Sequence, residues 1–331
     1  MLFKGFFGNA SAKEQLTNAL QSGRMPHAVL IDGPQGSGKR TLARIIAAAA
    51  VCESTTERPC GICRQCINAF ADNHADIMSY SGEKARSFSV DTVRKIRSEA
   101  YISPNDADIK VYILIGIHNM TEQAQNALLK IIEEPPAHVM FVMTCEGRSR
   151  VLSTVQSRCA LVTLGSVSEE EAVTALLADV PLIERDKALQ AAALSGYIIG
   201  RAKKGLEEGS YSEAATLADA FSKALCGATE YDFIKLSGKF EKGSSLFAAF
   251  LELLPQLFRD ALCAKNGVSS RLSGCGEEAL KLSRNLTQRQ LYTLISTSLS
   301  ARAALDRNAN ATLLATALFS NMWQDAHGAI N

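Results

Sequence analysis

The stretch that decides the fold is HAVLIDGPQGSGKRT, residues 27–41. It opens with a short apolar run that ends in glycine, and the segment KRTLARIIAAAAV from Lys39 has helical periodicity. Between them lies a glycine-rich loop close to G-x-x-x-x-G-K-[ST], a pattern whose backbone N–H groups and lysine hold nucleotide phosphates. A strand, such a loop and a helix in this order predict a phosphate loop formed by Gly33, Gly36, Ser37, Gly38, Lys39, Arg40 and Thr41.

The loop departs from the pattern at its last position. The pattern places a hydroxyl there to hold Mg²⁺, whereas this chain has Arg40, and Thr41 follows one residue later. Hydrolysis also needs acids at the end of a second strand. The matching strand, VYILIGIHNM at residues 111–120, has Ile115 and Gly116 in the places of those acids. Two parts of the magnesium site are therefore missing, and we predict no Mg²⁺-dependent hydrolysis.

Other polar residues near these segments do not replace the missing acids. Asp32 precedes the loop and Glu122 follows the second strand, but neither lies at the expected place. His118 is interpreted as a structural or surface histidine rather than a substitute base.

Strand-like and helix-like segments alternate through the first half of the chain. Apolar runs that begin at residues 76, 110, 140 and 161 predict strands, and helices are expected at about 89–101 and 121–134. Pro135 and Pro136 end the second of these helices. Near-continuous apolar strands separated by helices indicate a parallel sheet covered on both faces.

The strands stop after Gly165, and the rest of the chain reads as helices. Ser168 and Glu171 form a capping-box pattern at the start of one of them. We therefore predict an α/β nucleotide-loop domain at 1–165, a small helical domain at 166–210 and an all-helical domain at 211–331.

Charge and hydropathy exclude some classes of protein. The 331 residues carry 35 basic and 34 acidic side chains, a formal net charge of +1, so a contact with DNA must come from a local patch or through partners. No stretch reaches the roughly 18 apolar residues that span a bilayer, and the N-terminus does not read as a secretory signal. We expect a cytosolic protein without a membrane span.

Four cysteines gather in CESTTERPCGICRQC, residues 52–66. Cys52, Cys60, Cys63 and Cys66 follow the spacing C-x7-C-x2-C-x2-C, and four thiolates complete a closed tetrahedral Zn²⁺ site. The alternative is a group of buried or redox-active thiols. In a reducing compartment such a cluster is read first as metal ligands, so we predict structural zinc. The remaining cysteines are scattered and expected in the core.

Several motifs together carry a family resemblance. They are the phosphate-loop stretch, the four-cysteine insert, MTEQAQNALLKIIEEPP at 120–136, QSRC at 156–159 and LDRNANATLLATALF at 305–319. In this combination the chain resembles the δ′ subunits of the bacterial DNA polymerase III clamp loader, members of the AAA+ class related to the γ/τ subunits. The resemblance covers essentially the whole chain.

The resemblance implies a role in a complex. Clamp-loader subunits form a pentameric ring that opens the sliding clamp, loads it at primer–template DNA and places ATP sites between subunits. The resemblance implies γ/τ and δ subunits as partners and a cytoplasmic location at the replisome, within the polymerase III holoenzyme. It also implies that residues 166–210 form a lid and residues 211–331 an oligomerising collar.

The resemblance also assigns roles to single residues. Ser157, Arg158 and Cys159 match the S-R-C motif, so Arg158 is expected to act as an arginine finger in a neighbour's ATP site. Thr144 or Cys145 matches the first sensor region. Arg201, in Gly200-Arg201-Ala202, resembles the second sensor that touches a phosphate, although a solvated helix residue is the alternative.

Three functions are weighed. A non-hydrolysing δ′ subunit agrees with the missing acids and leaves ATP or ADP binding open. An active γ/τ-type ATPase would need Mg²⁺ held through Thr41 and an acid not identified here. A zinc-dependent DNA-binding protein is disfavoured, because the insert carries only Arg58 and Arg64 as basic residues and no aromatic platform.

Overall fold

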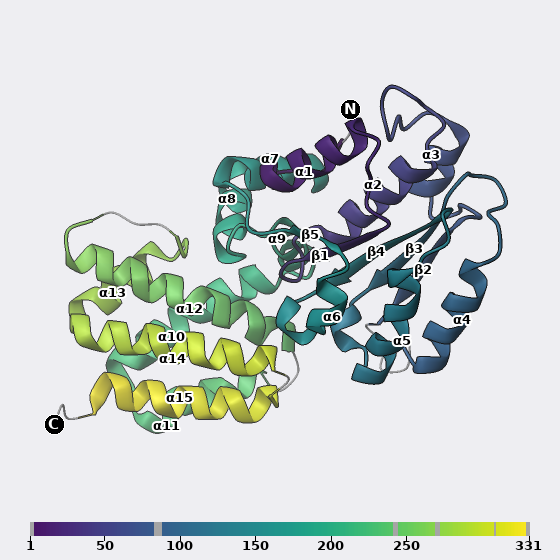
Figure 1. Ribbon diagram of the computed structural model, residues 1–331. Helices are drawn as coiled ribbons and strands as arrows, with labels where there is room; N and C mark the ends of the chain where they lie inside the picture. Colours follow the sequence, from purple (N-terminus) through teal and green to yellow (C-terminus); the bar gives the residue numbers. More distant parts are fainter. Residues whose placement is uncertain (1–2, 83–87, 241–243, 269–271, 308, 329–331) are drawn as a thin grey trace. The chain divides into compact units, whose positions relative to one another are not determined.

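The computed structural model describes residues 3–82, 88–240, 244–268, 272–307 and 309–328 (Figure 1). The chain forms two compact units, Met1–Glu171 and Ala172–Asn331, and each is described by itself. The separation of the second half into domains at 166–210 and 211–331 stays a prediction.

Unit 1 contains a five-stranded parallel sheet in the order β2-β3-β4-β1-β5. The strands are β1 (Ala28–Asp32), β2 (Ile77–Ser81), β3 (Lys110–Ile115), β4 (Val139–Cys145) and β5 (Ala160–Thr163). The helices are α1 (Ala10–Gln21), α2 (Lys39–Val51), α3 (Arg64–Phe70), α4 (Val90–Ala100), α5 (Glu122–Glu133) and α6 (Ser153–Gln156). Short 3-10 turns lie at η1 (Ile117–Asn119) and η2 (Arg148–Arg150). The predicted parallel α/β sheet is confirmed.

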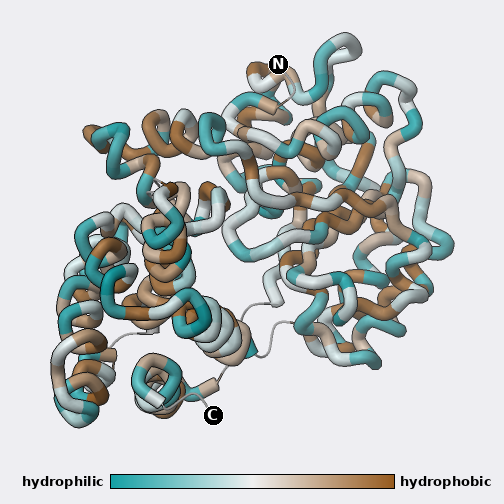
Figure 2. The backbone as a smooth tube through the Cα atoms, turned by 90° about the vertical axis from the view of Figure 1, so that its left-hand side faces the viewer, coloured by the Kyte–Doolittle hydropathy of each residue, from teal (hydrophilic) through white to brown (hydrophobic). Residues whose placement is uncertain are grey.

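Both faces of this sheet are buried. Tyr112 and Leu114 of β3 belong to a core with residues of α4 and α5, while the alternate residues Val111 and Ile113 belong to a second core with residues of α1 and α2. Side chains alternate between the faces of a strand, so an all-apolar strand feeds two cores at once. Every residue of β4 is accordingly buried, as are all but the last residue of β1 and of β3. Hydrophobic stretches of the chain are brown in Figure 2.

Local signals fix the two helices that follow β2 and β3. The Ser89 side chain accepts a hydrogen bond from the Thr92 N–H at the start of α4, and Thr121 accepts one from Ala124 at the start of α5. Helix α5 ends at Glu133, shortly before Pro135, because the residue before a proline avoids helical dihedrals. The expected helices at 89–101 and 121–134 are confirmed within a residue or two.

Unit 2 is built from helices. They are α7 (Glu169–Asp179, which begins at the end of unit 1), α8 (Arg185–Leu194), α9 (Ile199–Glu207), α10 (Ser210–Gly227), α11 (Glu230–Lys235), η3 (Leu236–Phe240), α12 (Ser244–Lys265), α13 (Gly276–Asn285), α14 (Gln288–Asp306) and α15 (Ala311–His327). Phe221 lies at the centre of its core, with the rings of Phe233, Phe250, Phe258 and Phe319 between 5.2 and 6.1 Å away. Capping contacts join Ser168 to Glu171 and Thr287 to Gln290.

Within the described ranges, no helix has the length and apolar character needed to cross a membrane.

Candidate nucleotide and metal sites

The phosphate loop joins β1 to α2, as the sequence predicts. Gly36 and Gly38 have φ angles of 85° and 90°, which L side chains rarely adopt. A Cβ atom on Gly33 would lie 2.6 Å from the Leu164 carbonyl oxygen and 2.8 Å from Ser37 Oγ. The glycines are therefore required by backbone geometry. Because the N–H groups at the start of a helix lack helical partners, the loop and the first turn of α2 have the form of an anion site.

Lys39 has hydrogen-bond partners both within the loop and beside it. Its Nζ donates hydrogen bonds to the carbonyl oxygens of Gly33 and Pro34, both at 2.8 Å, and lies 3.3 Å from Glu146 Oε1. Burial lowers the pKa of Lys39, and the neighbouring Glu146 carboxylate acts in the opposite direction. Ser37 Oγ is buried and has no hydrogen-bond partner in the described part of the chain.

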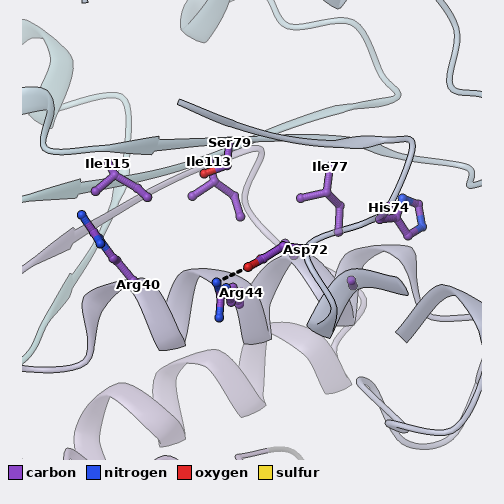
Figure 3. A pocket seen from close by; sticks show the side chains of 10 residues that line it. Arg40, Arg44, Asp72, His74, Ile77, Ser79, Ile113 and Ile115 are labelled. Atoms are coloured by element: carbon purple, nitrogen blue, oxygen red, sulfur yellow. Dashed lines mark hydrogen bonds and ion pairs between the residues drawn. The ribbon is translucent and has the colours of Figure 1, made fainter. Parts of the chain in front are cut away.

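Arg40 and Thr41 are exposed on the first turn of α2. The Arg40 side chain rises toward Ile115 at the end of β3 (Figure 3), and both line a pocket of about 420 Å³. The pocket is also lined by Arg44, Ala47, Ala69, Asp72, His74, Ile77, Ser79 and Ile113. Among the described lining residues, the one carboxylate is that of Asp72, which pairs with Arg44.

Residues at the ends of β1, β3 and β4 bond to one another. Thr144 Oγ1 accepts a hydrogen bond from the Gly116 N–H at 3.0 Å, and the Cys145 thiol donates to Asp32 Oδ1 at 3.3 Å. Burial, with the nearby Asp32 charge, raises the pKa of Cys145 to about 12. Both candidates for the first sensor are thus buried and engaged, and their role stays a prediction.

His118, in η1, accepts a hydrogen bond at Nδ1 from the Glu146 N–H at 3.1 Å. Burial lowers its pKa, and the Arg150 charge acts in the same direction. A neutral ring that accepts from the backbone supports the structural interpretation of this histidine.

Arg158 lies directly after α6, in a segment held against α5. Its Nη2 lies 2.8 Å from Glu133 Oε1, and its Nη1 donates to the Thr154 carbonyl oxygen at 2.9 Å. The Arg158 side chain is 38% exposed. The guanidinium is therefore ordered but open to solvent in unit 1.

Arg201 lies in unit 2 and is engaged there. Its Nη1 lies 3.6 Å from Glu252 Oε1, which is also 3.3 Å from Arg302 Nη2. The Tyr211 hydroxyl donates to Glu252 Oε2 at 3.0 Å. Arg201 is therefore paired with Glu252, unlike the solvated helix residue considered as the alternative. The role of Arg201 toward a phosphate stays a prediction.

The structure brings the four predicted metal ligands together. The Sγ atoms of Cys52, Cys60, Cys63 and Cys66 all lie within 4.8 Å of one another. Sulfurs around a tetrahedral Zn²⁺ at about 2.3 Å lie about 3.8 Å apart, so small adjustments suffice.

Backbone N–H groups surround these sulfurs. The N–H groups of Cys60, Cys63 and Cys66 donate to the sulfurs of Cys52, Cys60 and Cys63 respectively, each at 3.4 Å. Backbone hydrogen bonds from Ile62 and Cys63 lower the pKa of Cys60 to about 6, whereas burial raises the pKa values of Cys52 and Cys66. Donors aimed at sulfur stabilise thiolates, the form that binds zinc. The residues therefore fit a tetrahedral thiolate-bound ion.

Sequence reasoning missed the carboxylates that hold the two key cations of unit 1. Glu146 directly follows β4 and reaches Lys39, and Glu133 ends α5 and reaches Arg158. Glu146 could have been found, because the carboxyl ends of parallel strands meet at one edge of the sheet, beside the loop that follows β1. Glu133 carries no such signal.

The sheet and the loop between β1 and α2 define unit 1 as an α/β domain of the P-loop class. Within it, residues 8–168 match the family described as "DNA polymerase III, delta subunit". The matched residues lie within unit 1.

Relatives of known name are similar over about half of the chain. The chain is 35% identical over 157 residues to DNA polymerase III subunit gamma/tau of Mycobacterium bovis, covering 47% of this chain and 27% of that protein. It is 34% identical over 170 residues to subunit gamma of Buchnera aphidicola from Acyrthosiphon pisum, covering 51% and 46%. Subunit tau of Bacillus subtilis is 34% identical over 158 residues, covering 47% and 28%. The chain thus spans less than half the length of these curated relatives.

Solved structures with a similar course of the chain are more distant. A gamma subunit-related protein of Thermotoga maritima has a TM-score of 0.44 at 20% identity, over 94% of this chain and 99% of that one. The DNA clamp loader delta protein of Bacillus subtilis has a TM-score of 0.39 at 10% identity, over 94% and 98%. Values this low assign no function.

Proposed function

We propose that this chain is a δ′-type subunit of the DNA polymerase III clamp loader that does not hydrolyse ATP itself and supplies Arg158 to a neighbour's ATP site. The observation that carries the proposal is that Arg40 and Ile115 occupy two positions of the expected magnesium site. They stand where a hydrolysing P-loop protein has a hydroxyl and an acid, and both line one pocket.

The residues at this place do not fit Mg²⁺. The ion needs oxygen ligands, of which carboxylates are the usual protein contribution. Arg40 brings a positive charge, and Ile115 brings no polar atom. Asp32 accepts from Cys145 Sγ and the Gly147 N–H, and Glu146 pairs with Lys39. No hydrolytic step is therefore assigned to this chain.

The loop still fits a phosphate group. Its glycines keep the conformation that turns N–H groups toward an anion, and Lys39 supplies a positive charge. An ATP or ADP phosphate would take over the lysine contacts now made by carbonyl oxygens and Glu146. Nucleotide binding without hydrolysis is part of the proposal.

Arg158 is the residue that contributes to chemistry in this proposal. An arginine finger stabilises charge on the transferred phosphoryl group and is worth about 10³–10⁵ in rate at its own site. The partial exposure of Arg158 in unit 1 supports such a contact.

The proposed setting follows from the family. The partners are γ/τ and δ subunits, and the complex acts in the cytoplasm on the sliding clamp and primer–template DNA. The helices at 211–331 form the collar that binds the partners, and Zn²⁺ at the four cysteines stabilises unit 1.

The test is Arg158→Ala in a complex reconstituted with γ/τ and δ subunits. Assembly should survive, as judged by size-exclusion chromatography, while DNA-stimulated ATPase and clamp loading fall. The total loss is smaller than the loss at one site, because other sites in the ring continue to work. Unchanged loading with intact assembly would refute the role given to Arg158.

A further inference from the structure

Two of the motifs that carry the family resemblance in unit 1 touch each other. Glu133 belongs to the E-E-P-P sequence at the end of α5, and Arg158 belongs to the S-R-C sequence after α6. Arg158 Nη2 lies 2.8 Å from Glu133 Oε1. The E-E-P-P motif has no other role in the proposed function, so this contact gives it one.

The other contacts of Arg158 lie close to it in sequence. Nη1 donates to the Thr154 carbonyl oxygen at 2.9 Å and to Ser157 Oγ at 3.3 Å. Arginine carries five N–H donors, so these contacts and Glu133 leave part of the guanidinium for a further acceptor. Glu133 is the contact from a different element, and it fixes the guanidinium relative to α5.

Helix α5 also holds the backbone that leads to Arg158. Gln125 is buried, its Oε1 accepts from the Leu152 N–H at 2.8 Å, and its Nε2 donates to the Arg150 carbonyl oxygen at 3.3 Å. Two side chains of α5 therefore act on one segment. Gln125 places its backbone, and Glu133 places its charged group.

The location of Glu133 is unfavourable unless a cation lies beside it. The residue ends α5, where the helix dipole is negative and disfavours a carboxylate. Arg158 supplies the compensating charge. Glu134, Pro135 and Pro136 follow, and the prolines keep the helix from extending, so Glu133 stays at its end.

We infer that Glu133 is the positioning residue of the arginine finger, an inference that rests on the proposed function of Arg158. A free arginine side chain loses rotamer entropy when it is fixed against a ligand. Glu133 orders the guanidinium before the neighbour's nucleotide arrives, so less entropy is lost when the finger engages. Glu133 itself touches no nucleotide.

The test uses the reconstituted complex in a form in which the ATP site facing this chain is the one competent site, the other P-loop lysines being replaced. Glu133→Gln keeps the shape of the side chain and removes its charge. We expect kcat for ATP to fall about twofold to fivefold, the range that an exposed ion pair supports, with KM unchanged. Glu133→Asp keeps the charge and should lose less. The matched control is Glu134→Gln, which alters the neighbouring exposed carboxylate and should leave kcat unchanged.

The decisive measurement is the double variant. If Glu133 acts through Arg158, adding Glu133→Gln to Arg158→Ala should cause no further loss of kcat. If Glu133→Gln lowers kcat by the same factor with Arg158 present and with Arg158→Ala, the inference is overturned. A rise in kcat for Glu133→Gln would overturn it as well. If Glu133→Gln has no effect on kcat while Arg158→Ala lowers it, the positioning role of Glu133 is wrong and the arginine-finger role of Arg158 is retained. If Arg158→Ala has no effect, the finger is wrong and this inference falls with it.

Discussion

Lys39 Nζ, in the phosphate loop, lies 3.3 Å from Glu146 Oε1, at the end of β4. The same ammonium group donates to two carbonyl oxygens of its own loop, those of Gly33 and Pro34. The lysine that should meet a phosphate is thus already surrounded by acceptors. A nucleotide phosphate, which is negatively charged like the Glu146 carboxylate, must displace that carboxylate before it can bind Lys39.

The first prediction concerns this competition. We expect Glu146→Gln to bind ATP and ADP about threefold to tenfold more tightly than the unaltered chain, which corresponds to about 0.7 to 1.4 kcal/mol. The amide removes the repulsion between Glu146 and the phosphates and leaves the lysine and the loop in place. Titration of the purified chain with a fluorescent nucleotide measures the change.

A matched control for Glu146 is Glu122→Gln, an exposed glutamate in the first turn of α5. Its nucleotide affinity should equal that of the unaltered chain. Equal or weaker binding by the Glu146 variant would show that this carboxylate does not compete with phosphate.

The second prediction concerns a buried carboxylate near the start of β2. Asp76 is fully buried, and its oxygens accept from the backbone N–H groups of Asn105, Asp106 and Ala107 at 2.6 to 2.9 Å. Burial alone would raise the pKa of Asp76, but these donors outweigh it and lower the pKa below its ordinary value. Asp76→Asn replaces an acceptor oxygen with a donor and should lower the free energy of unfolding by about 2 to 4 kcal/mol.

The pH dependence of this effect has a definite sign. Because the pKa of Asp76 is lower in the folded chain, its contribution is full above the unfolded value of about 3.9 and is lost as pH falls through the folded pKa. The difference between Asp76→Asn and the unaltered chain should therefore shrink as pH falls below about 4. Urea unfolding at several pH values measures it, with exposed Asp108→Asn as the control. A difference that grows toward acid would contradict the assignment.

The sequence predicted what depends on short-range pattern. The apolar run at 110–117 became β3, Thr121 and Pro135 bracket α5, and the spacing of the four cysteines brought their sulfurs together. Each of these follows from residues within about one element of each other. Strand periodicity and turn residues are therefore enough to find them.

The contacts that hold the site could not be read in this way. Glu133 meets Arg158 and Glu252 meets Arg201 only because the chain returns to the same place. A lone glutamate at a helix end or in a helix interior has the same local pattern whether it is solvated or paired. The packing of distant elements decides between the two.

The third prediction is that the chain binds one Zn²⁺ through Cys52, Cys60, Cys63 and Cys66. Metal analysis of protein purified without added zinc should return about one equivalent, because four thiolates form a closed site. Cys63→Ser should lose most of this zinc and melt at a lower temperature, since zinc binding contributes to folding. Cys263→Ser, at a half-buried cysteine outside the cluster, should keep its zinc. Full zinc content in the Cys63 variant would disprove the site.

The fourth prediction separates two roles for Arg201. Arg201 and Arg302 both pair with Oε1 of the largely buried Glu252, so Arg201→Ala and Arg302→Ala should each destabilise unit 2, by about 1 to 3 kcal/mol. The second-sensor role of Arg201 predicts in addition that only Arg201→Ala weakens ATP binding. Thermal unfolding and nucleotide titration of both variants provide the comparison. Equal affinities would assign Arg201 to the packing of unit 2 alone.

The last prediction is that the purified chain, with Mg²⁺ and ATP in excess, shows no steady-state ATPase above the level of its Lys39→Ala variant. Arg40 stands where the hydroxyl ligand of Mg²⁺ is needed, and Ile115 brings no carboxylate to the end of β3. Restoring one part should not be enough. Arg40→Thr returns the hydroxyl, yet nothing at the end of β3 then holds the metal or orients a water, so we expect this variant to remain inactive too. Turnover by the unaltered chain that disappears in Lys39→Ala would show instead that the chain hydrolyses ATP with an acid outside the expected place.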